Sequence, residues 1–220
     1  MYTLYIGNKN YSTWSLRAWV LMRALGIPFA EKRILLYRPD SPRELGAASP
    51  SGKVPCLHDG DVVVWDTLAI AEYLAERHRG VWPDDGGARA WARSVAAEMH
   101  SGFAPLREEM GMSVRLRMSK APSPAVAANI ARILALWVEG RERFGRAGEF
   151  LCGAFGAVDA FWCPVAFRFQ SYGVPLAGLA KSYACALLEL PAMRDWAADA
   201  ERETERIPGF DAPESEAQRQ

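Results

Sequence analysis

Short apolar runs separated by polar turns fill the first third of the chain and predict alternating strands and helices. Residues 3–6 form a β-prone run, residues 12–24 predict a helix, and residues 29–36 return to the alternation of a strand. Gly26 and Pro28 are typical of a helix end. A strand that returns after a single helix pairs in parallel with the first strand through a right-handed crossover. We therefore expect a βαβ unit.

The next segment predicts a β-hairpin and then a helix. Residues 39–51 are rich in Pro, Ser, Gly and Ala, so we expect irregular backbone there, with at most a short helix. Two β-prone runs then flank the pair Asp59-Gly60, which favours a tight turn. A helix capped by Asp66 and ending near residue 77 completes the order βαβ-ββα.

No convincing strand follows residue 79, so the remainder predicts a helical bundle. Helical patterns are expected at 89–110, from 124 to about 146, at 156–172, at 176–190 and at 191–206. The helix at 156–172 is apolar nearly all round, which predicts a buried central position, although Pro164 would loosen it. The fold class is α+β, with one domain at 1–80, an all-α domain at 88–206, and a poorly ordered polar tail at 207–220.

Composition and charge narrow the possible partners. The chain has 26 basic and 26 acidic residues and a pI near 6.8, so neither nucleic acid nor an anionic membrane is expected as the main partner. It begins directly with a strand pattern and has no long apolar segment, which favours a cytoplasmic protein. The four cysteines form no metal-binding cluster, so no metal is expected. Cys56 is either a redox site or a small buried apolar residue, and we favour the second.

Three short segments could carry chemistry. Ser12 begins a predicted helix, where a hydroxyl and the helix dipole would together stabilise a thiolate brought by a ligand. The Val54-Pro55 bond is either an ordinary trans bond or a cis bond that leaves the Val54 backbone free to pair with an extended ligand. Asp66-Thr67 is either a helix cap alone or also a site for an α-amino acid head.

The remaining polar candidates give weaker signals. His58, His78 and His100 are isolated in the sequence and show neither metal-ligand spacing nor a triad partner. A basic run such as Arg115, Arg117 and Lys120 is more often a solvated connection than a binding site, although an anionic substrate would fit between the two long helices that it joins.

Taken together, these segments resemble a cytosolic glutathione S-transferase of the serine type, similar to the bacterial theta and zeta classes. The resemblance rests on four segments in order: 12–17 (STWSLR), 49–55 (SPSGKVP), 66–70 (DTLAI) and 153–159 (GAFGAVD). It implies a thioredoxin-like domain followed by an all-α domain, in a two-fold homodimer. Gly156 stands where the family has Ser or Thr, so Asp159 alone keeps its part of the helix cap.

The resemblance also implies roles for individual residues. Ser12 would donate to the glutathione sulfur, with Asn10 and Tyr11 as alternative donors. Val54 would pair with the cysteinyl backbone and Lys53 with the glycyl carboxylate. Asp66 and Thr67 would hold the γ-glutamyl head. A pocket for the second substrate is expected near a further set of residues: Trp14, Met110, Met112 and Arg115.

Three functions follow as hypotheses. The first is a glutathione transferase for detoxification, in which the activated thiolate attacks a small apolar electrophile. The second is a glutathione-dependent isomerase of the maleylacetoacetate type, with Arg115 or Arg117 holding an anionic substrate; Trp14 counts against it because zeta enzymes usually have cysteine there. The third is a glutathione-fold binding protein without catalytic activity, which would have no need of the retained ligand set.

Overall fold

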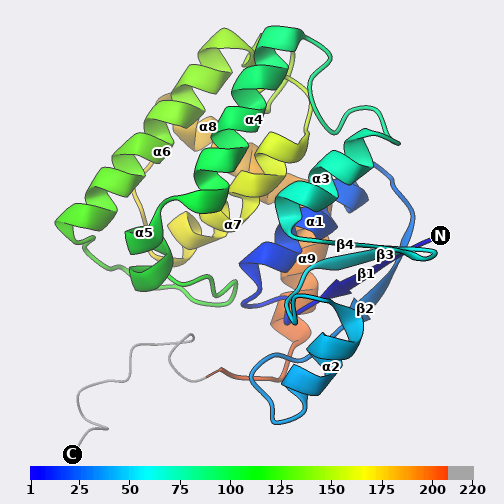
Figure 1. Cartoon of the computed structure of the whole chain (residues 1–220). Helices are drawn as coiled ribbons and strands as arrows, with labels where there is room; N and C mark the ends of the chain where they lie inside the picture. Colours follow the sequence, from blue (N-terminus) through cyan, green and yellow to red (C-terminus); the bar gives the residue numbers. More distant parts are fainter. Residues whose placement is uncertain (208–220) are drawn as a thin grey trace, which may run out of the picture.

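The computed structural model describes residues 1–207 and contains a mixed four-stranded sheet in the order β2-β1-β3-β4 (Figure 1). β1 (Tyr2–Ile6) pairs in parallel with β2 (Phe29–Arg33), and helix α1 (Thr13–Ala24) connects the two strands. β3 (Cys56–Asp59) runs antiparallel to both β1 and β4 (Val62–Trp65). The predicted βαβ unit and hairpin are confirmed, and Gly60 makes the turn at a φ of 59°.

Two further helices belong to the sheet region. Helix α2 (Ser41–Ala48) is the short helix allowed by the Pro- and Ser-rich segment, and it lies on the face of the sheet opposite α1 and α3 (Figure 1). Helix α3 (Thr67–Ala75) follows β4 and is capped by Asp66, whose side chain accepts from the Leu68 N–H at 2.8 Å. The thioredoxin-like topology expected for this part of the chain is confirmed.

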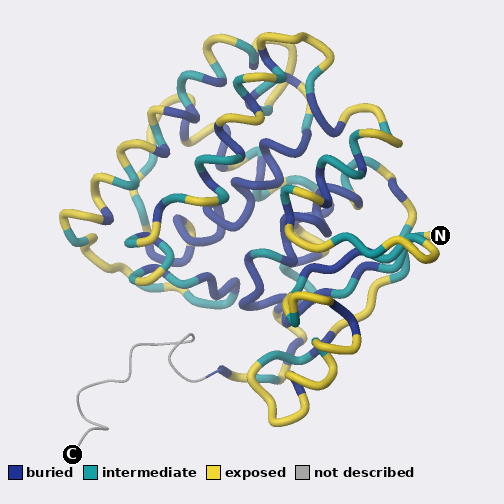
Figure 2. The backbone as a smooth tube through the Cα atoms, viewed as in Figure 1, coloured by how far each residue is buried: buried dark blue, intermediate teal, exposed yellow. Residues whose placement is uncertain are grey.

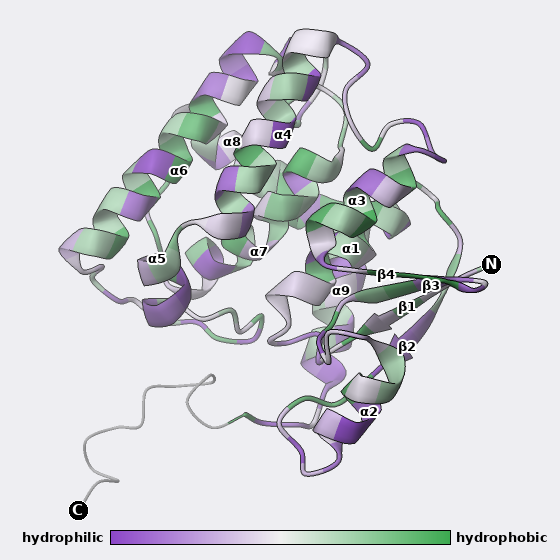
Figure 3. Cartoon of the chain, in the orientation of Figure 1, coloured by the Kyte–Doolittle hydropathy of each residue, from purple (hydrophilic) through white to green (hydrophobic). Residues whose placement is uncertain are grey.

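Only helices follow α3 within the described residues. They are α4 (Gly86–Ser101), α5 (Ala104–Glu109), α6 (Pro124–Arg143), the 3-10 turn η1 (Gly145–Ala147), α7 (Ala157–Ser171), α8 (Gly178–Glu189) and α9 (Pro191–Arg202). The helix α6 alternates between hydrophilic and hydrophobic bands, as a helix with one exposed face does (Figure 3). The α+β class is confirmed, whereas the domain limits stay a prediction, and the expected disorder of residues 208–220 lies outside the described residues.

The single helix predicted over 89–110 is wrong. The structure divides it into α4 and α5 at Gly102 and Phe103. Pro105 lies at the start of α5, where its missing N–H is tolerated, and it could not continue α4 because its ring would displace the preceding turn. Phe103 takes a left-handed backbone conformation with a φ of 62° at this break, and its ring packs against Trp162.

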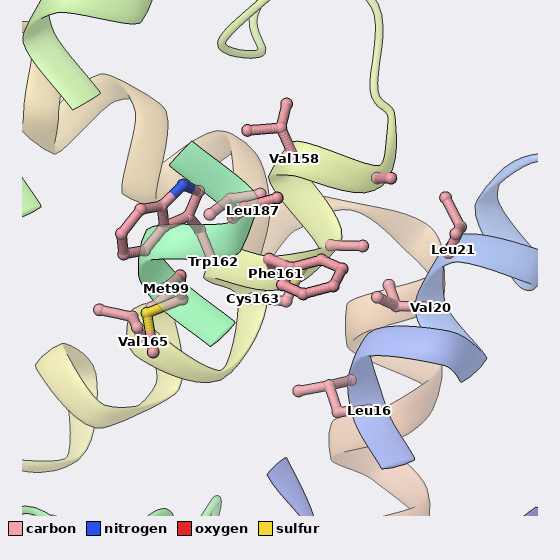
Figure 4. Packing of buried hydrophobic residues seen from close by; sticks show 14 of the residues in the cluster. Leu16, Val20, Leu21, Met99, Val158, Phe161, Trp162, Cys163, Val165 and Leu187 are labelled. Carbon is pink, nitrogen blue, oxygen red and sulfur yellow. The ribbon is translucent and has the colours of Figure 1, made fainter. Parts of the chain in front are cut away.

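Helix α7 is the buried centre of the molecule, as its apolar sequence predicts (Figure 2). It packs against α1, α4 and α8, and the helix continues through Pro164. Leu16 and Val20 of α1 point toward Phe161 and Cys163 of α7 in the interface (Figure 4). Each large apolar side chain buried in this way contributes roughly 1.5–3 kcal/mol. One continuous core therefore joins the sheet region to the helices.

A buried carboxylate, Asp159, holds the start of α7 in place. It accepts hydrogen bonds from the backbone N–H groups of Leu151 and Gly156 and from the Tyr183 hydroxyl, at 3.0, 3.0 and 2.9 Å. Burial raises the pKa of Asp159 to about 6, in opposition to these three donors. With Gly156 at the cap position, Asp159 provides the side-chain half of the capping interaction, as predicted.

The chain after α9 returns to the loop that follows β1. Glu203 accepts from the backbone N–H groups of Lys9 and Asn10 at 2.6 and 3.0 Å and pairs with Arg33 at 3.0 Å. The Trp196 indole donates to the Lys9 carbonyl at 2.8 Å. These contacts anchor the loop just before α1. In the described part of the chain, no helix is long and apolar enough to cross a membrane.

We expect replacement of Asp159 by Ala to lower the free energy of unfolding by about 2–4 kcal/mol, because three donors lose their buried acceptor. Asp159→Asn should lie between Ala and the wild type, because an amide oxygen serves only part of the donor set. Denaturant unfolding followed by fluorescence measures both. Asp195→Ala, at an exposed position of α9, is the control and should change stability by less than about 0.5 kcal/mol. Equal midpoints for Asp159→Ala and wild type would show that the cap contributes nothing.

Candidate active site

A cavity of about 580 Å³ lies between the sheet region and the helices, within the size range of small-molecule sites. The sheet region contributes the start of α1 at residues 11–14, residues 36–38, part of α2, and residues 52–54 before β3. The helical region contributes Arg107, Gly111, Met112 and Arg168. The cavity therefore brings together segments that are far apart in the sequence.

Ser12 occupies the N-cap position of α1 and lines the cavity. Its hydroxyl donates to Ser15 Oγ at 2.7 Å, and Ser15 Oγ also accepts from the Gly7 N–H at 2.9 Å. A side chain at Gly7 would clash with Leu36 and crowd Ser12 Oγ, which explains the glycine. A thiolate bound here would replace Ser15 as the acceptor of the Ser12 hydroxyl and would lie at the positive end of the α1 dipole.

The two neighbours that the sequence left as alternatives point elsewhere. The Asn10 side chain is fully buried, where it donates to Ser113 Oγ and accepts from the Arg115 N–H, both at 3.0 Å. The Tyr11 ring lines the cavity, but its hydroxyl accepts from Arg115 Nη2 at 3.1 Å and from the Ile207 N–H at 3.3 Å. Of these three side chains, Ser12 is the one whose hydrogen bond stays within the helix start.

Lys53 and Val54 line the same cavity, and the Val54-Pro55 peptide bond is cis. Gly52 precedes them with a φ of 64°, a left-handed conformation that a side chain would strain. The Lys53 ammonium forms no ion pair within residues 1–207. These features place one positive charge and one backbone segment beside the start of α1.

Asp66 and Thr67 lie at the start of α3 and contact His100 of α4 instead of lining the cavity. His100 Nε2 is 3.3 Å from Asp66 Oδ2, and its Nδ1 is 3.5 Å from Thr67 Oγ1. Asp66 has a φ of 73° at this point. Burial lowers the pKa of His100, and the positive charges of Arg17 and Arg107 lower it further, whereas Asp66 raises it. In the sequence His100 is isolated, but the packing of α3 against α4 brings it into contact with Asp66 and Thr67.

Comparison with known proteins identifies the first part of the chain. The family model described as the glutathione S-transferase N-terminal domain matches residues 11–77, the segment that holds Ser12, Lys53 and Asp66. Over these residues the chain is similar to a glutathione S-transferase N-terminal domain. A crystal structure of a glutathione transferase homolog from Burkholderia, titled as having bound glutathione, has the same fold at a TM-score of 0.67 and 21% identity, covering 91% of this chain and 97% of that one.

Curated relatives match the chain more locally. A probable maleylacetoacetate isomerase of Caenorhabditis elegans is 31% identical over 44% of this chain, and the match spans about half of that relative, 48% of its length. Glutathione S-transferase 1 of Dianthus caryophyllus is 25% identical over 79% of this chain and 80% of its own length. Membership of the serine type stays a prediction.

The residues predicted for a second-substrate pocket divide into two groups. Trp14 and Met112 line the cavity, whereas Met110 is fully buried outside its lining. Arg115 does not line it either. Its guanidinium donates to the carbonyl groups of Glu203 and, at 3.1 Å, of Glu205 in the segment after α9. The segment after α9 supplies these carbonyls, and no local spacing could have revealed them.

Two cavity residues, Arg107 and Arg168, were missed in the sequence. Arg107 Nε donates to the Gly102 carbonyl at 3.0 Å, and Arg168 Nε donates to the Met110 carbonyl at 2.7 Å. Burial and the positive charge of Arg107 lower the pKa of Arg168 to about 9. Arg168 looked like part of an apolar core helix, and the only available signal was its charge within that run.

The Trp14 ring makes cation–π contacts with two arginines of this region. The guanidinium carbon of Arg17 lies 4.4 Å from the Trp14 ring centre and 4.9 Å from that of Phe161. The guanidinium of Arg107 lies 5.1 Å from the same Trp14 ring. Arg17 is 1% exposed, its three guanidinium nitrogens have no hydrogen-bond partner among residues 1–207, and burial lowers its pKa. Aromatic faces therefore take the place of a carboxylate in stabilising this charge.

The cysteines lie outside this site, and residues 1–207 contain no group of His, Cys, Asp or Glu side chains suited to a metal. Burial raises the pKa of Cys56 and Cys163, and raises that of Cys152 to about 12. Cys185 is exposed on α8. This environment favours the interpretation of Cys56 as a small buried apolar residue.

We expect one thiol per native chain to react rapidly with a chromogenic disulfide reagent at pH 8, because the thiolate is the reactive form and Cys185 is the exposed cysteine. Release of the coloured thiol measures the number. Unfolding in guanidinium should raise it to all four cysteines. The variant Cys185→Ser should lose the rapid phase, and rapid reaction of that variant would show that one of the buried thiols is accessible.

Proposed function

We propose that this protein is a glutathione S-transferase that binds glutathione in the cavity and activates its thiol for attack on a small electrophile. The observation that carries the proposal is the meeting of Ser12, at the start of α1, with Lys53 and Val54 in one cavity. The family match over residues 11–77 supports the same assignment.

The chemistry assigns one part of the cavity to each half of the reaction. The glutathione thiol loses its proton to solvent, and the Ser12 hydroxyl and the α1 dipole stabilise the thiolate. The sulfur then forms a bond to an electrophilic carbon, and the leaving group departs with the electrons of the bond that breaks. Lys53 pairs with the glycyl carboxylate, and the Val54 backbone pairs with the cysteinyl residue. Trp14 and Met112 line the part of the cavity where the electrophilic substrate would bind.

Asp66 and Thr67 lie outside the lining of the cavity, and they are proposed to hold the γ-glutamyl head of glutathione at the start of α3, with the thiol end of the tripeptide in the cavity. The Asp66 carboxylate offers an acceptor for the ammonium group, and the first N–H groups of α3 offer donors for the carboxylate. His100 contacts both side chains and so acts as a positioning residue between α3 and α4.

The relative named as a probable maleylacetoacetate isomerase favours a second candidate, glutathione-dependent isomerisation. In that reaction the thiolate adds beside a carbonyl, the intermediate rotates, and glutathione leaves again. Net consumption of glutathione distinguishes the two reactions, because only the transferase consumes it. Trp14, in place of the cysteine usual in zeta enzymes, favours the transferase.

We also infer a cytoplasmic homodimer with the domain limits given by the sequence. The four unpaired cysteines fit a reducing compartment. Val62 and Trp65 expose 46% and 45% of their surfaces on the outer strand β4, where a second copy of the chain would cover them.

Ser12→Ala should return the pKa of the bound glutathione thiol toward the value of about 8.5 that is usual for a free thiol, from about two units lower in the wild type. Thiolate absorbance in the ultraviolet, followed against pH, measures it. Tyr11→Phe is the matched control and should keep the lowered pKa. A lowered pKa in Ser12→Ala together with a normal pKa in Tyr11→Phe would make Tyr11 the donor. Bound glutathione with an ordinary pKa in the wild type would favour a binding protein without catalysis.

Lys53→Ala should weaken glutathione binding by about tenfold or more, because one charge-assisted contact to a carboxylate is lost. Isothermal titration calorimetry measures the change. Lys181→Ala, at an exposed position on α8, is the control and should bind as the wild type does. Equal affinity of the Lys53 and Lys181 variants would remove Lys53 from the proposed site.

A further inference from the structure

The cavity has an unbalanced charge. Its lining includes the cations Arg38, Lys53, Arg107 and Arg168, and none of the described lining residues is acidic. Arg38 lies 3.8 Å from Glu205, and Lys53 is assigned above to glutathione. Arg107 and Arg168, on the helical side, form no ion pair with any residue in 1–207. Two positive charges are therefore left without a counter-charge where the second substrate would bind.

Backbone carbonyl groups hold the guanidinium groups of Arg107 and Arg168 in place, and each guanidinium keeps nitrogen atoms without a hydrogen-bond partner among the described residues. Arg168 is 3% exposed, its Nε donates to Met110, and its Nη1 is buried with no hydrogen-bond partner among the described residues. Its Nη2 has neither a partner nor full burial and is thus the nitrogen left to the cavity. Arg107 uses Nε and Nη2 on the carbonyl groups of Gly102, Met99 and His100, which leaves Nη1.

The environment of the pair makes an anion the matching ligand. A buried charge without a partner is costly, and here two guanidiniums lie near enough for Arg107 to lower the pKa of Arg168. Arg17 adds a third positive charge that acts on the same region. A bound anion would offset this repulsion and supply the missing hydrogen-bond acceptors.

We propose that the electrophilic substrate carries a carboxylate, which Arg107 and Arg168 hold on the helical side of the cavity. A carboxylate has two oxygen atoms, so one oxygen can accept from the open nitrogen of each arginine. This inference deepens the proposed function and rests on it. It replaces Arg115 and Arg117 as the residues for an anionic substrate, because Arg115 binds the segment after α9 and Arg117 donates to the carbonyl groups of Val114 and Leu116 outside the cavity.

The test uses an unreactive pair of probes, a dinitrobenzoate and the matching dinitrobenzamide, titrated by calorimetry into the full-length protein with glutathione present. The wild type should bind the carboxylate at least tenfold more tightly than the amide. Arg168→Met and Arg107→Met should each reduce this preference by about tenfold, and Arg168→Lys, which keeps the charge, should retain part of it. Arg117→Met is the control and should bind both probes as the wild type does.

The same variants are then assayed with the reactive chloro derivatives of both probes. In Arg107→Met and Arg168→Met we expect kcat/KM to fall for the chloro carboxylate and to change less than about threefold for the chloro amide. In the control Arg117→Met both values should stay as in the wild type. The affinity for glutathione and the pKa of its thiol, measured in every variant, report whether the fold and the proposed glutathione site are intact.

Three results would overturn the inference. One is equal affinity of the wild type for both probes. Another is an equal loss of affinity for both probes in the arginine variants, which would show that the arginines have a structural role. The third is weaker glutathione binding as the main effect, which would place these arginines on glutathione itself. Selective carboxylate binding without conjugation of either chloro derivative would instead support the carboxylate site while contradicting the proposed transferase function.

Discussion

The packing of α1 against α7 is the contact on which the rest of the structure depends, because it joins the sheet region to the helices through one apolar core (Figure 4). The two helices also carry the site, since Ser12 begins α1 and Arg168 lies near the end of α7. A shift of α7 relative to α1 would therefore move the acceptor side of the cavity relative to the proposed thiolate. The close packing of a protein core makes such a shift costly, and the three hydrogen bonds of Asp159 restrain the start of α7.

The polar residues between the two regions are arranged around positive charge. Aromatic rings of Trp14 and Phe161 flank Arg17, and backbone carbonyls hold Arg107 and Arg168. Neither kind of partner neutralises a guanidinium as a carboxylate would, so the charges remain available to a ligand. Acidic partners are placed at the edge of this region, where Asp66 contacts His100. The lining of the cavity is thus positively charged, which is consistent with both proposed ligands, glutathione and an electrophile that carries a carboxylate.

The loop before α1 owes its position to the segment that follows α9, which is distant in the sequence. Glu203 accepts from two backbone N–H groups of this loop, and Arg115 links Tyr11 to the segment after α9. These contacts hold the loop backbone and the Tyr11 hydroxyl just before the helix start, while Ser12 lines the cavity. The position of the helix start that holds Ser12 therefore depends on contacts with residues that lie nearly two hundred positions away in the sequence.

The sequence by itself determined the local elements and the segments of the proposed glutathione site that line the cavity at Ser12, Lys53 and Val54. Periodicity, turn residues and caps predicted the βαβ unit, the hairpin at Asp59-Gly60 and the buried helix α7, because these depend on neighbours within a few positions. The break between α4 and α5 was missed, although Pro105 signals it, because the helical pattern continues on both sides. Only the tertiary structure decided the helical side of the cavity: it directed Arg115 to the segment after α9, brought His100 to Asp66, and placed Arg107 and Arg168 in one cavity lining. The physical reason is that hydrogen bonds and charge pairing between distant helices depend on how the helices pack, and side-chain spacing along the chain does not contain that information.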